Sequence, residues 1–120
     1  FFEIIKSVID QNLHNQKIEW HEDKSISVVL CSKGYPEKYE NNVEIKDLGK
    51  IKLDNNNFIF HAGTKRENLK IFSNGGRVLN FVSISKNFKD AREQALTLIK
   101  DLNWSNGFYR RDIGNKVIDE

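Results

Sequence analysis

The sequence predicts an α+β domain in which mostly antiparallel strands pack against one helix, with a further helix at the start of the chain. Three observations support this class: short β-branched and aromatic runs between polar turns, one long stretch with helical apolar spacing, and a helical pattern in the first residues. A length of 120 residues suits a single domain. An apolar share of 38% and a charged share of 30% favour a globular fold over a disordered one.

The chain opens with apolar residues at helical spacing, namely Phe2, Ile5, Val8 or Ile9, and Leu13. We expect this helix to end near Asn15, because asparagine is a favoured C-terminal cap. No Ser, Thr, Asp or Asn stands before Phe2 as an N-cap, and the first residue is not Met. A stop signal without a start signal is typical of a truncated helix, although a disordered or removed upstream region would leave the same pattern. We expect the chain to be a fragment of a larger protein.

Five runs rich in β-branched and aromatic residues predict strands at 17–20, 25–31, 58–62, 69–72 and 78–85. Clusters of glycine and polar residues predict turns at 34–36, 65–68 and 74–76. The strands at 58–62 and 69–72 should form a hairpin about the turn between them. The polar stretch 37–50 is expected to be a surface loop that holds one short strand at 43–48.

The clearest helix follows the last of these strands. Asn87 is expected to cap it, and Asp90 lies in the first turn, where a negative charge is favourable. Its apolar face consists of Phe88, Ala91, Ala95, Leu98, Ile99 and Leu102. Trp104 and the Asn-Gly pair at 106–107 should end it, and residues 108–114 are expected to form a short strand and a turn.

The composition argues against several classes of function. The net charge is +2, from 19 basic and 17 acidic residues mixed along the chain, which does not favour a nucleic-acid-binding surface. No apolar run approaches the roughly 20 residues that span a bilayer. Cys31 is the only cysteine, so an internal disulfide is excluded. Its apolar surroundings predict a packing role, and the lack of a disulfide fits the reducing cytoplasm.

Patterns typical of catalytic or metal-binding groups are not evident. His14, His21 and His61, together with one cysteine, lack the spacing of a zinc site. No set of Ser, His and Asp favours nucleophilic catalysis, and no paired carboxylates stand out. A lone histidine on a strand, such as His61, is more often a satisfied polar group than a ligand or a base. The chain therefore carries anion-binding residues without a recognisable catalytic group.

The turn at 73–77 is the first candidate binding site. Gly75 and Gly76 permit a positive φ, and exposed backbone N–H groups in such a turn can face an anion. Arg77 adds a planar fork of donors that suits phosphate or carboxylate. The alternative is a hairpin turn followed by a surface arginine. The segment is not a P-loop, because the Gly-Lys-Ser/Thr ending is missing.

The second candidate consists of polar and charged residues near the C-terminus, Tyr109, Arg110, Arg111 and Asp112. Adjacent arginines on a strand point to opposite faces, so one can enter a site while the other pairs with Asp112 or Glu120. Lys33, beside a glycine turn, is the third candidate. The alternatives to these two sites are a solvated basic tail and an ordinary loop.

Five segments, in this order, resemble one known family: Ser-Lys-Gly-Tyr-Pro at 32–36, His-Ala-Gly-Thr-Lys at 61–65, Ser-Asn-Gly-Gly-Arg-Val-Leu at 73–79, Asp-Ala-Arg at 90–92, and Phe-Tyr-Arg-Arg-Asp-Ile-Gly at 108–114. Each segment alone is a weak signal, but their order and spacing together are specific. From about residue 20 to its end, the chain resembles the C-terminal domain of phosphoribosylamine–glycine ligase, also called glycinamide ribonucleotide synthetase. Residues 1–20 resemble the last helix and exit of the preceding ATP-grasp domain.

The resemblance implies that the parent is an ATP-grasp ligase of de novo purine synthesis. Such an enzyme joins glycine to 5-phosphoribosylamine through an acyl phosphate, giving glycinamide ribonucleotide, and uses ATP with Mg²⁺ or Mn²⁺. The family's metal ligands lie in an upstream segment, so the chain alone is expected to bind neither ATP nor metal and to be inactive.

The resemblance also implies a fold and a site. Residues 21–120 should form a small barrel-like sheet with one helix that closes over the active site. Gly75, Gly76 and Arg77 are then the first choice for contacting the substrate phosphate or the glycine carboxylate. The turn at 109–112 is the second choice, and Lys33 adds a further cation.

Two other functions stay open at this point. A closing domain of another ATP-grasp enzyme, of the carboxylase type, would share the architecture but is not expected to share the Gly-Gly-Arg and Tyr-Arg-Arg-Asp-Ile-Gly segments. A small nucleic-acid-binding module would use Trp104, Phe108 and Tyr109 with the adjacent arginines as a stacking and basic surface. The balanced charge disfavours that function, so small molecules, rather than nucleic acid or membrane, are the expected partners.

Overall fold

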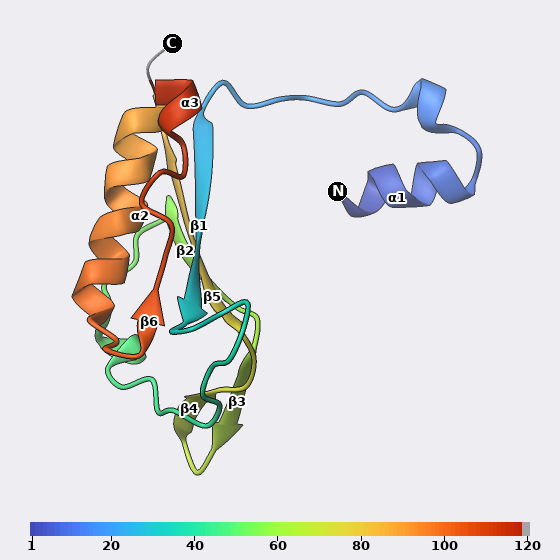
Figure 1. Cartoon of the computed structure of the whole chain (residues 1–120). Helices are drawn as coiled ribbons and strands as arrows, with labels where there is room; N and C mark the ends of the chain where they lie inside the picture. Colours follow the sequence, from blue (N-terminus) through green and yellow to red (C-terminus); the bar gives the residue numbers. More distant parts are fainter. Residues whose placement is uncertain (119–120) are drawn as a thin grey trace.

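A four-stranded antiparallel sheet forms the centre of the molecule in the computed structural model, which describes residues 1–118 (Figure 1). The strand order is β2 (Asn57–His61), β5 (Arg77–Ser85), β1 (Lys24–Ser32) and β6 (Gly107–Phe108). Strands β3 (Thr64–Glu67) and β4 (Lys70–Ser73) form a separate hairpin at one end. The predicted α+β class with antiparallel strands is confirmed, and the expected barrel-like sheet takes the form of this open sheet with its hairpin.

The two long strands β1 and β5 set which side chains enter the core. Residues on one strand alternate between the two faces, so Ile26, Val28 and Leu30 all point to the same side. Val28 pairs with Phe81 across the ladder, and both side chains are fully buried. The register shifts between Leu30 and Cys31, so Cys31 lies opposite Arg77.

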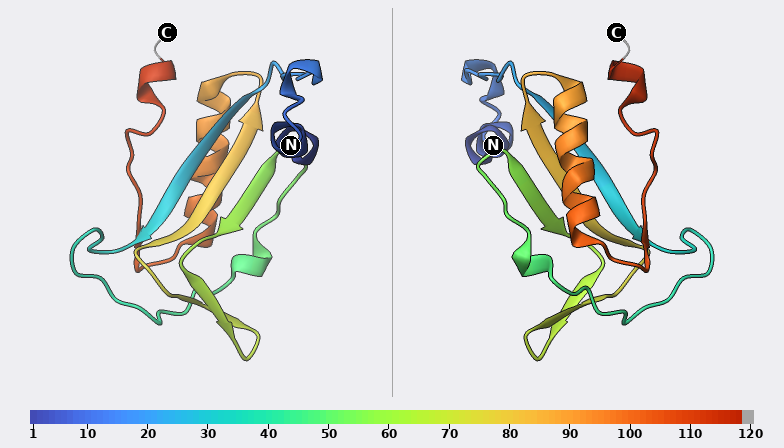
Figure 2. Two further views of the ribbon diagram at one scale, coloured as in Figure 1. Left: turned by 90° about the vertical axis from the view of Figure 1, so that its right-hand side faces the viewer. Right: turned by 90° about the vertical axis from the view of Figure 1, so that its left-hand side faces the viewer.

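Helix α2 (Phe88–Leu102) covers the face of the sheet that carries this core (Figure 2). Asn87 caps the helix as predicted, since its side-chain oxygen accepts a hydrogen bond of 2.8 Å from the amide of Asp90. The helix ends at Leu102, where Asn103 adopts a left-handed conformation. The predicted apolar face is confirmed, and its buried members are Ala91, Ala95, Leu98, Ile99 and Leu102.

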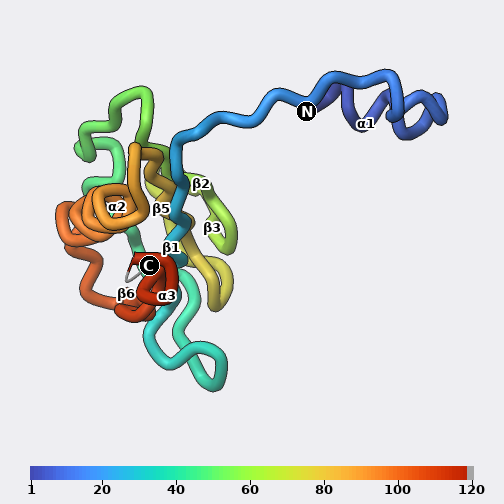
Figure 3. Tube along the Cα trace, turned by 90° about the horizontal axis from the view of Figure 1, so that it is seen from above, coloured from blue at the N-terminus to red at the C-terminus, as the bar shows by residue number. Residues whose placement is uncertain are grey.

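The N-terminal region differs from its prediction beyond the first helix. Helix α1 (Phe2–Ile9) is present, but it ends well before Asn15, which lies in a 3₁₀ turn η1 (Leu13–Asn15). The chain reverses at Gln11, whose φ of 55° stops the helix. Residues 17–20 form no strand, because no neighbouring strand offers them a ladder of hydrogen bonds, and Trp20 is 86% exposed. Seen from above, α1 stands clear of the sheet at the end of this extended segment (Figure 3).

The hairpin prediction was wrong in its pairing. The polar residues at 65–68 belong largely to β3, and the tight turn lies at Asn68 and Leu69, which both have positive φ. Strand β2 pairs with β5 instead of β4. A turn of this kind usually contains Asn-Gly. Here the pair is Asn-Leu, so the sequence does not predict the turn. The predicted strand at 43–48 is reduced to a single bridge between Glu44 and Phe72, followed by a 3₁₀ turn η2 (Leu48–Lys50).

The C-terminal segment after α2 returns along the edge of the sheet. Its short strand β6 and the turn that follows agree with the prediction, and a one-turn helix α3 (Asn115–Ile118) then packs near the start of α2. No helix among residues 1–118 is both long and apolar enough to cross a membrane.

Candidate functional site

The sheet face opposite α2 carries the candidate site. Within residues 1–118 no helix packs on this face. It presents apolar and polar side chains from the three longest strands, namely Ser27, Val29 and Cys31, Phe58 and Phe60, and Asn80 and Val82. We call this surface the open face. Phe58 is 37% exposed and Phe60 is 53% exposed, and their rings stack with centroids 6.0 Å apart.

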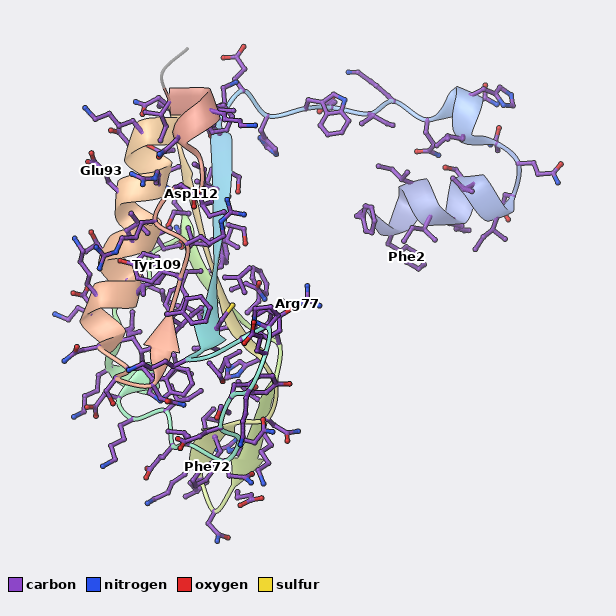
Figure 4. All side chains as sticks on the ribbon, in the orientation of Figure 1. Phe2, Phe72, Arg77, Glu93, Tyr109 and Asp112 are labelled. Carbon is purple, nitrogen blue, oxygen red and sulfur yellow. The ribbon has the colours of Figure 1, made fainter. Side chains whose placement is uncertain are left out.

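The turn before Arg77 is fixed by hydrogen bonds from two other segments. At the end of β1, Ser32 donates from its amide to the carbonyl of Gly76 at 2.8 Å and from its hydroxyl to the carbonyl of Gly75 at 3.1 Å. From the end of β2, the amide of Gly63 donates to the carbonyl of Arg77 at 2.8 Å. The turn is therefore a rigid base for an exposed arginine, which points away from α2 (Figure 4).

Gly76 has a packing role beside the binding role predicted for it. It is buried, and a Cβ at this position would collide with the aromatic ring of Tyr35. Tyr35 in turn lies 5.9 Å from Tyr39, measured between ring centroids. The absence of a side chain at Gly76 thus lets the Tyr35 ring lie directly on the turn.

Two hollows open on the open face and share Val29 and Tyr35 as walls. The first has a volume of about 490 Å³ and is lined by Val29, Tyr35, Ala62, Gly63, Gly76, Arg77 and Asn80. The second has a volume of about 290 Å³ and is lined by Ser27, Val29, Cys31, Tyr35, Pro36, Phe108, Arg110 and Ile113. Each hollow therefore has one arginine in its wall, and Tyr35 separates them.

The two arginines differ in their electrostatic surroundings. Arg110 makes a two-pronged ion pair with Asp112, with Nε to Oδ1 at 3.0 Å and Nη2 to Oδ2 at 2.5 Å. The hydrogen bond from Arg110 holds the pKa of Asp112 below its usual value, and Asp112 raises the pKa of Arg110. Arg77 makes no ion pair in the part of the chain that the structure describes. Its charge is therefore available to an anion.

Arg92 on α2 organises the C-terminal segment. Its Nε donates to the carbonyl of Ile113 at 2.7 Å, and its Nη2 donates to the carbonyl of Arg111. Gly114 follows with a φ of 84°, and a Cβ there would lie 2.8 Å from the Ile26 side chain. In the sequence, Arg92 stands out only as part of the family resemblance, and its place on the polar face of α2 gives no sign of this contact.

The remaining predicted residues do not join the open face. Tyr109 packs against the core on the α2 side, where it lines a hollow with Leu30 and Ile99. Arg111 is exposed, and its carbonyl is the acceptor for Arg92. Lys33 is exposed at the end of β1, outside the linings of both hollows. Glu120, the alternative partner for an arginine, lies outside the described residues.

Other candidate groups have structural roles or none. The Nδ1 atom of His61 lies 2.8 Å from the Thr64 hydroxyl, so its ring has a local partner. Cys31 is only partly buried, in the wall of the second hollow, and this burial raises the pKa of its thiol while Arg77 acts in the opposite direction. Among residues 1–118, no group of three or more His, Cys, Asp and Glu side chains could hold a metal ion.

Comparison with known proteins identifies the family. The family model described as phosphoribosylglycinamide synthetase, C domain, matches residues 25–116. The chain belongs to this family. The matched range begins at β1 and ends in α3, so it contains the sheet, α2 and both arginine-bearing turns. Helix α1 lies before it.

Several relatives show where the C domain lies in longer proteins. The chain is 41% identical over 119 residues to phosphoribosylamine–glycine ligase of Fusobacterium nucleatum, matching 98% of the chain and 28% of that protein. It is 35% identical over 121 residues to the trifunctional purine biosynthetic protein adenosine-3 of Gallus gallus, covering 98% of the chain but 12% of that protein. The chain thus spans about a quarter, or less, of these relatives.

A solved structure supports the fold. The crystal structure of phosphoribosylamine–glycine ligase from Thermotoga maritima matches with a TM-score of 0.69 and 29% sequence identity, over 93% of the chain and 28% of that protein. The likeness to this family therefore extends from the sequence to the fold over nearly the whole chain.

Proposed function

We propose that this C domain completes the active site of an ATP-dependent ligase that joins glycine to 5-phosphoribosylamine in the cytoplasm. The observation that carries the proposal is the open face, an uncovered side of the sheet with an arginine in the wall of each of two hollows. Family membership supplies the reaction class, and the arginines suit its anionic substrates. The chain alone carries out no chemistry in this proposal.

The partner of the open face is the preceding ATP-grasp domain of the same protein. Two stacked phenylalanines, Phe58 and Phe60, stand exposed on this face, and a contiguous apolar surface of this kind is typical of an interface. Residues 1–20, with α1, belong to that preceding domain, and residues 21–120 form the closing domain. The apolar side chains of α1 support this division, because Phe2 and Ile9 are more than 70% exposed.

The substrates are recognised by the arginine at the edge of each hollow. We call these edges the Arg77 rim and the Arg110 rim. Arg77 meets the 5′-phosphate of phosphoribosylamine, because its guanidinium pairs with no carboxylate among residues 1–118 and the turn at Gly75 and Gly76 holds it in place. Arg110 keeps its charge partly neutralised by Asp112, so it acts mainly as a directed hydrogen-bond donor, for the carboxylate of glycine. Lys33, Tyr109 and Arg111 have supporting roles at most in this scheme.

ATP and Mg²⁺ or Mn²⁺ bind to the preceding domain in this proposal. The family resemblance implies metal ligands upstream of this chain, so the metal-binding chemistry is assigned to the preceding domain. The metal ion would balance the phosphate charges of ATP during phosphoryl transfer. The C domain contributes binding groups and excludes water from the closed site.

An Arg77→Ala substitution in the intact parent enzyme tests the proposal. Losing a hydrogen bond to a charged group costs about 1.5–3 kcal/mol, so kcat/KM for 5-phosphoribosylamine should fall at least about tenfold. KM for ATP should stay unchanged. Lys89→Ala, which removes an exposed cation from α2, is the matched control and should behave as wild type. Unchanged kinetic constants in Arg77→Ala would refute the assignment of this rim.

A further inference from the structure

We infer that Arg92 is a positioning residue that holds Arg110 at the rim of the second hollow. This inference rests on the proposed function of the open face. Arg92 does not line either hollow, and it lies on α2, which packs on the other face of the sheet. Its effect on the open face therefore passes through the backbone at 111–113.

The first step of this connection joins α2 to the C-terminal segment. One guanidinium donates two hydrogen bonds, to the carbonyls of Arg111 and Ile113, which stand on either side of Asp112. Two donors in a planar fork fix both the position and the direction of this short stretch. Close packing supports the same geometry, since a Cβ at Gly114 would lie 2.8 Å from the Ile26 side chain and 3.4 Å from the Cδ of Arg92.

The second step joins the segment to the open face. With its backbone fixed on both sides, Asp112 directs its carboxylate toward Arg110 and binds it through both oxygens. The positive charge of Arg92 also favours the ionised form of Asp112, because it contributes to the lowered pKa of this group. Figure 4 shows Asp112 on the segment that runs beside α2, whereas Arg77 lies at the far side of the sheet.

The two rims are therefore held by different means. The Arg77 rim is held by backbone hydrogen bonds within the sheet end, from Ser32 and Gly63. The Arg110 rim is held by a side-chain relay that starts on α2, through Arg92 and Asp112. Loss of Arg92 should disturb the Arg110 rim and leave the Arg77 rim intact.

A double-mutant cycle in the intact parent enzyme tests this inference. Arg92→Ala should raise KM for glycine about tenfold while kcat and KM for 5-phosphoribosylamine change less than about twofold. In an Arg110→Ala background, Arg92→Ala should add less than about twofold, because residues that act through one another are not additive. Arg92→Lys should give an intermediate KM, since an ammonium cannot donate as a planar fork. Lys89→Ala on the same helix should have no effect.

Each outcome of the cycle decides the inference. If Arg110→Ala impairs glycine use but Arg92→Ala does not, or if the two effects multiply independently, the positioning role of Arg92 is refuted while the proposed function stands. If neither Arg110→Ala nor Arg77→Ala alters substrate use, the proposed function itself fails. Hydrogen exchange in the 120-residue chain gives a second readout, in which Arg92→Ala must speed exchange at 107–118 and leave β1 and β5 protected. Unchanged exchange at 107–118 would also refute the role.

Discussion

The two faces of the central sheet are built from alternate residues of the same strands, yet they differ in what covers them. On the α2 side, Phe81 and Val28 are fully buried. On the open face, Phe60 sits on the neighbouring strand and is 53% exposed. One face therefore supplies most of the stability of this chain, whereas the other keeps apolar and cationic groups exposed for contact with the rest of the parent protein.

We expect the greatest loss of stability from a substitution on the buried face. Phe81→Ala removes a fully buried ring and should lower the free energy of unfolding by about 3–5 kcal/mol, because a cavity remains. Phe60→Ala makes the same chemical change on the open face and should cost less than about 1 kcal/mol in the 120-residue chain. Urea denaturation of both variants measures the contrast. Equal losses would contradict the assignment of the two faces.

A smaller loss of stability is expected when the packing beneath the first hollow is changed. Gly76→Ala places a methyl group where the Tyr35 ring lies, and overpacking of this kind costs about 1–3 kcal/mol. Gly49→Ala is the matched control, since a Cβ at Gly49 meets no atom within 4 Å. Thermal unfolding should separate the two variants, and adding Tyr35→Ala to Gly76→Ala should recover part of the loss. A Gly76→Ala protein as stable as Gly49→Ala would show that the ring yields freely.

The smallest effect concerns the ion pair of the second rim. The folded-state pKa of Asp112 is lowered, so the pair stabilises the folded chain above the ordinary aspartate pKa of about 3.9, and this contribution is lost as pH falls through the lower folded value. Asp112→Asn should therefore be slightly less stable than wild type at pH 7 and should match it in strong acid. Arg110→Ala should show the same pH dependence. A difference from wild type that persists at low pH would contradict this origin.

The regular core was predictable because its signals are local. Each signal predicts a single structure at its own position. The signals are the cap at Asn87, the spacing of Ala91, Ala95 and Leu98, and the β-branched run at β1. The failures came where pairing between distant segments decides. Residues 17–20 have strand-like composition but no partner strand, and the Asn68–Leu69 turn lacks the usual glycine signal.

The candidate site was predictable only in part. The Gly-Gly-Arg turn stood out as a motif, and the structure places Arg77 in the wall of a hollow on the open face. Side chains alternate along the extended residues that follow β6, which separates Tyr109 from Arg110, so only one of them faces this surface. Tyr35 and Arg92 carry no local signal, because their roles depend on contacts with residues about 20 to 40 positions away.

The Tyr35 ring is a wall that the two hollows share. The ring borders both hollows and rests on Gly76, so a shift of it changes the shape of both spaces. A change in affinity for one substrate after a Tyr35 substitution therefore cannot be assigned to one rim alone. Kinetics with both substrates, varied against each other, would be needed to separate the two contributions.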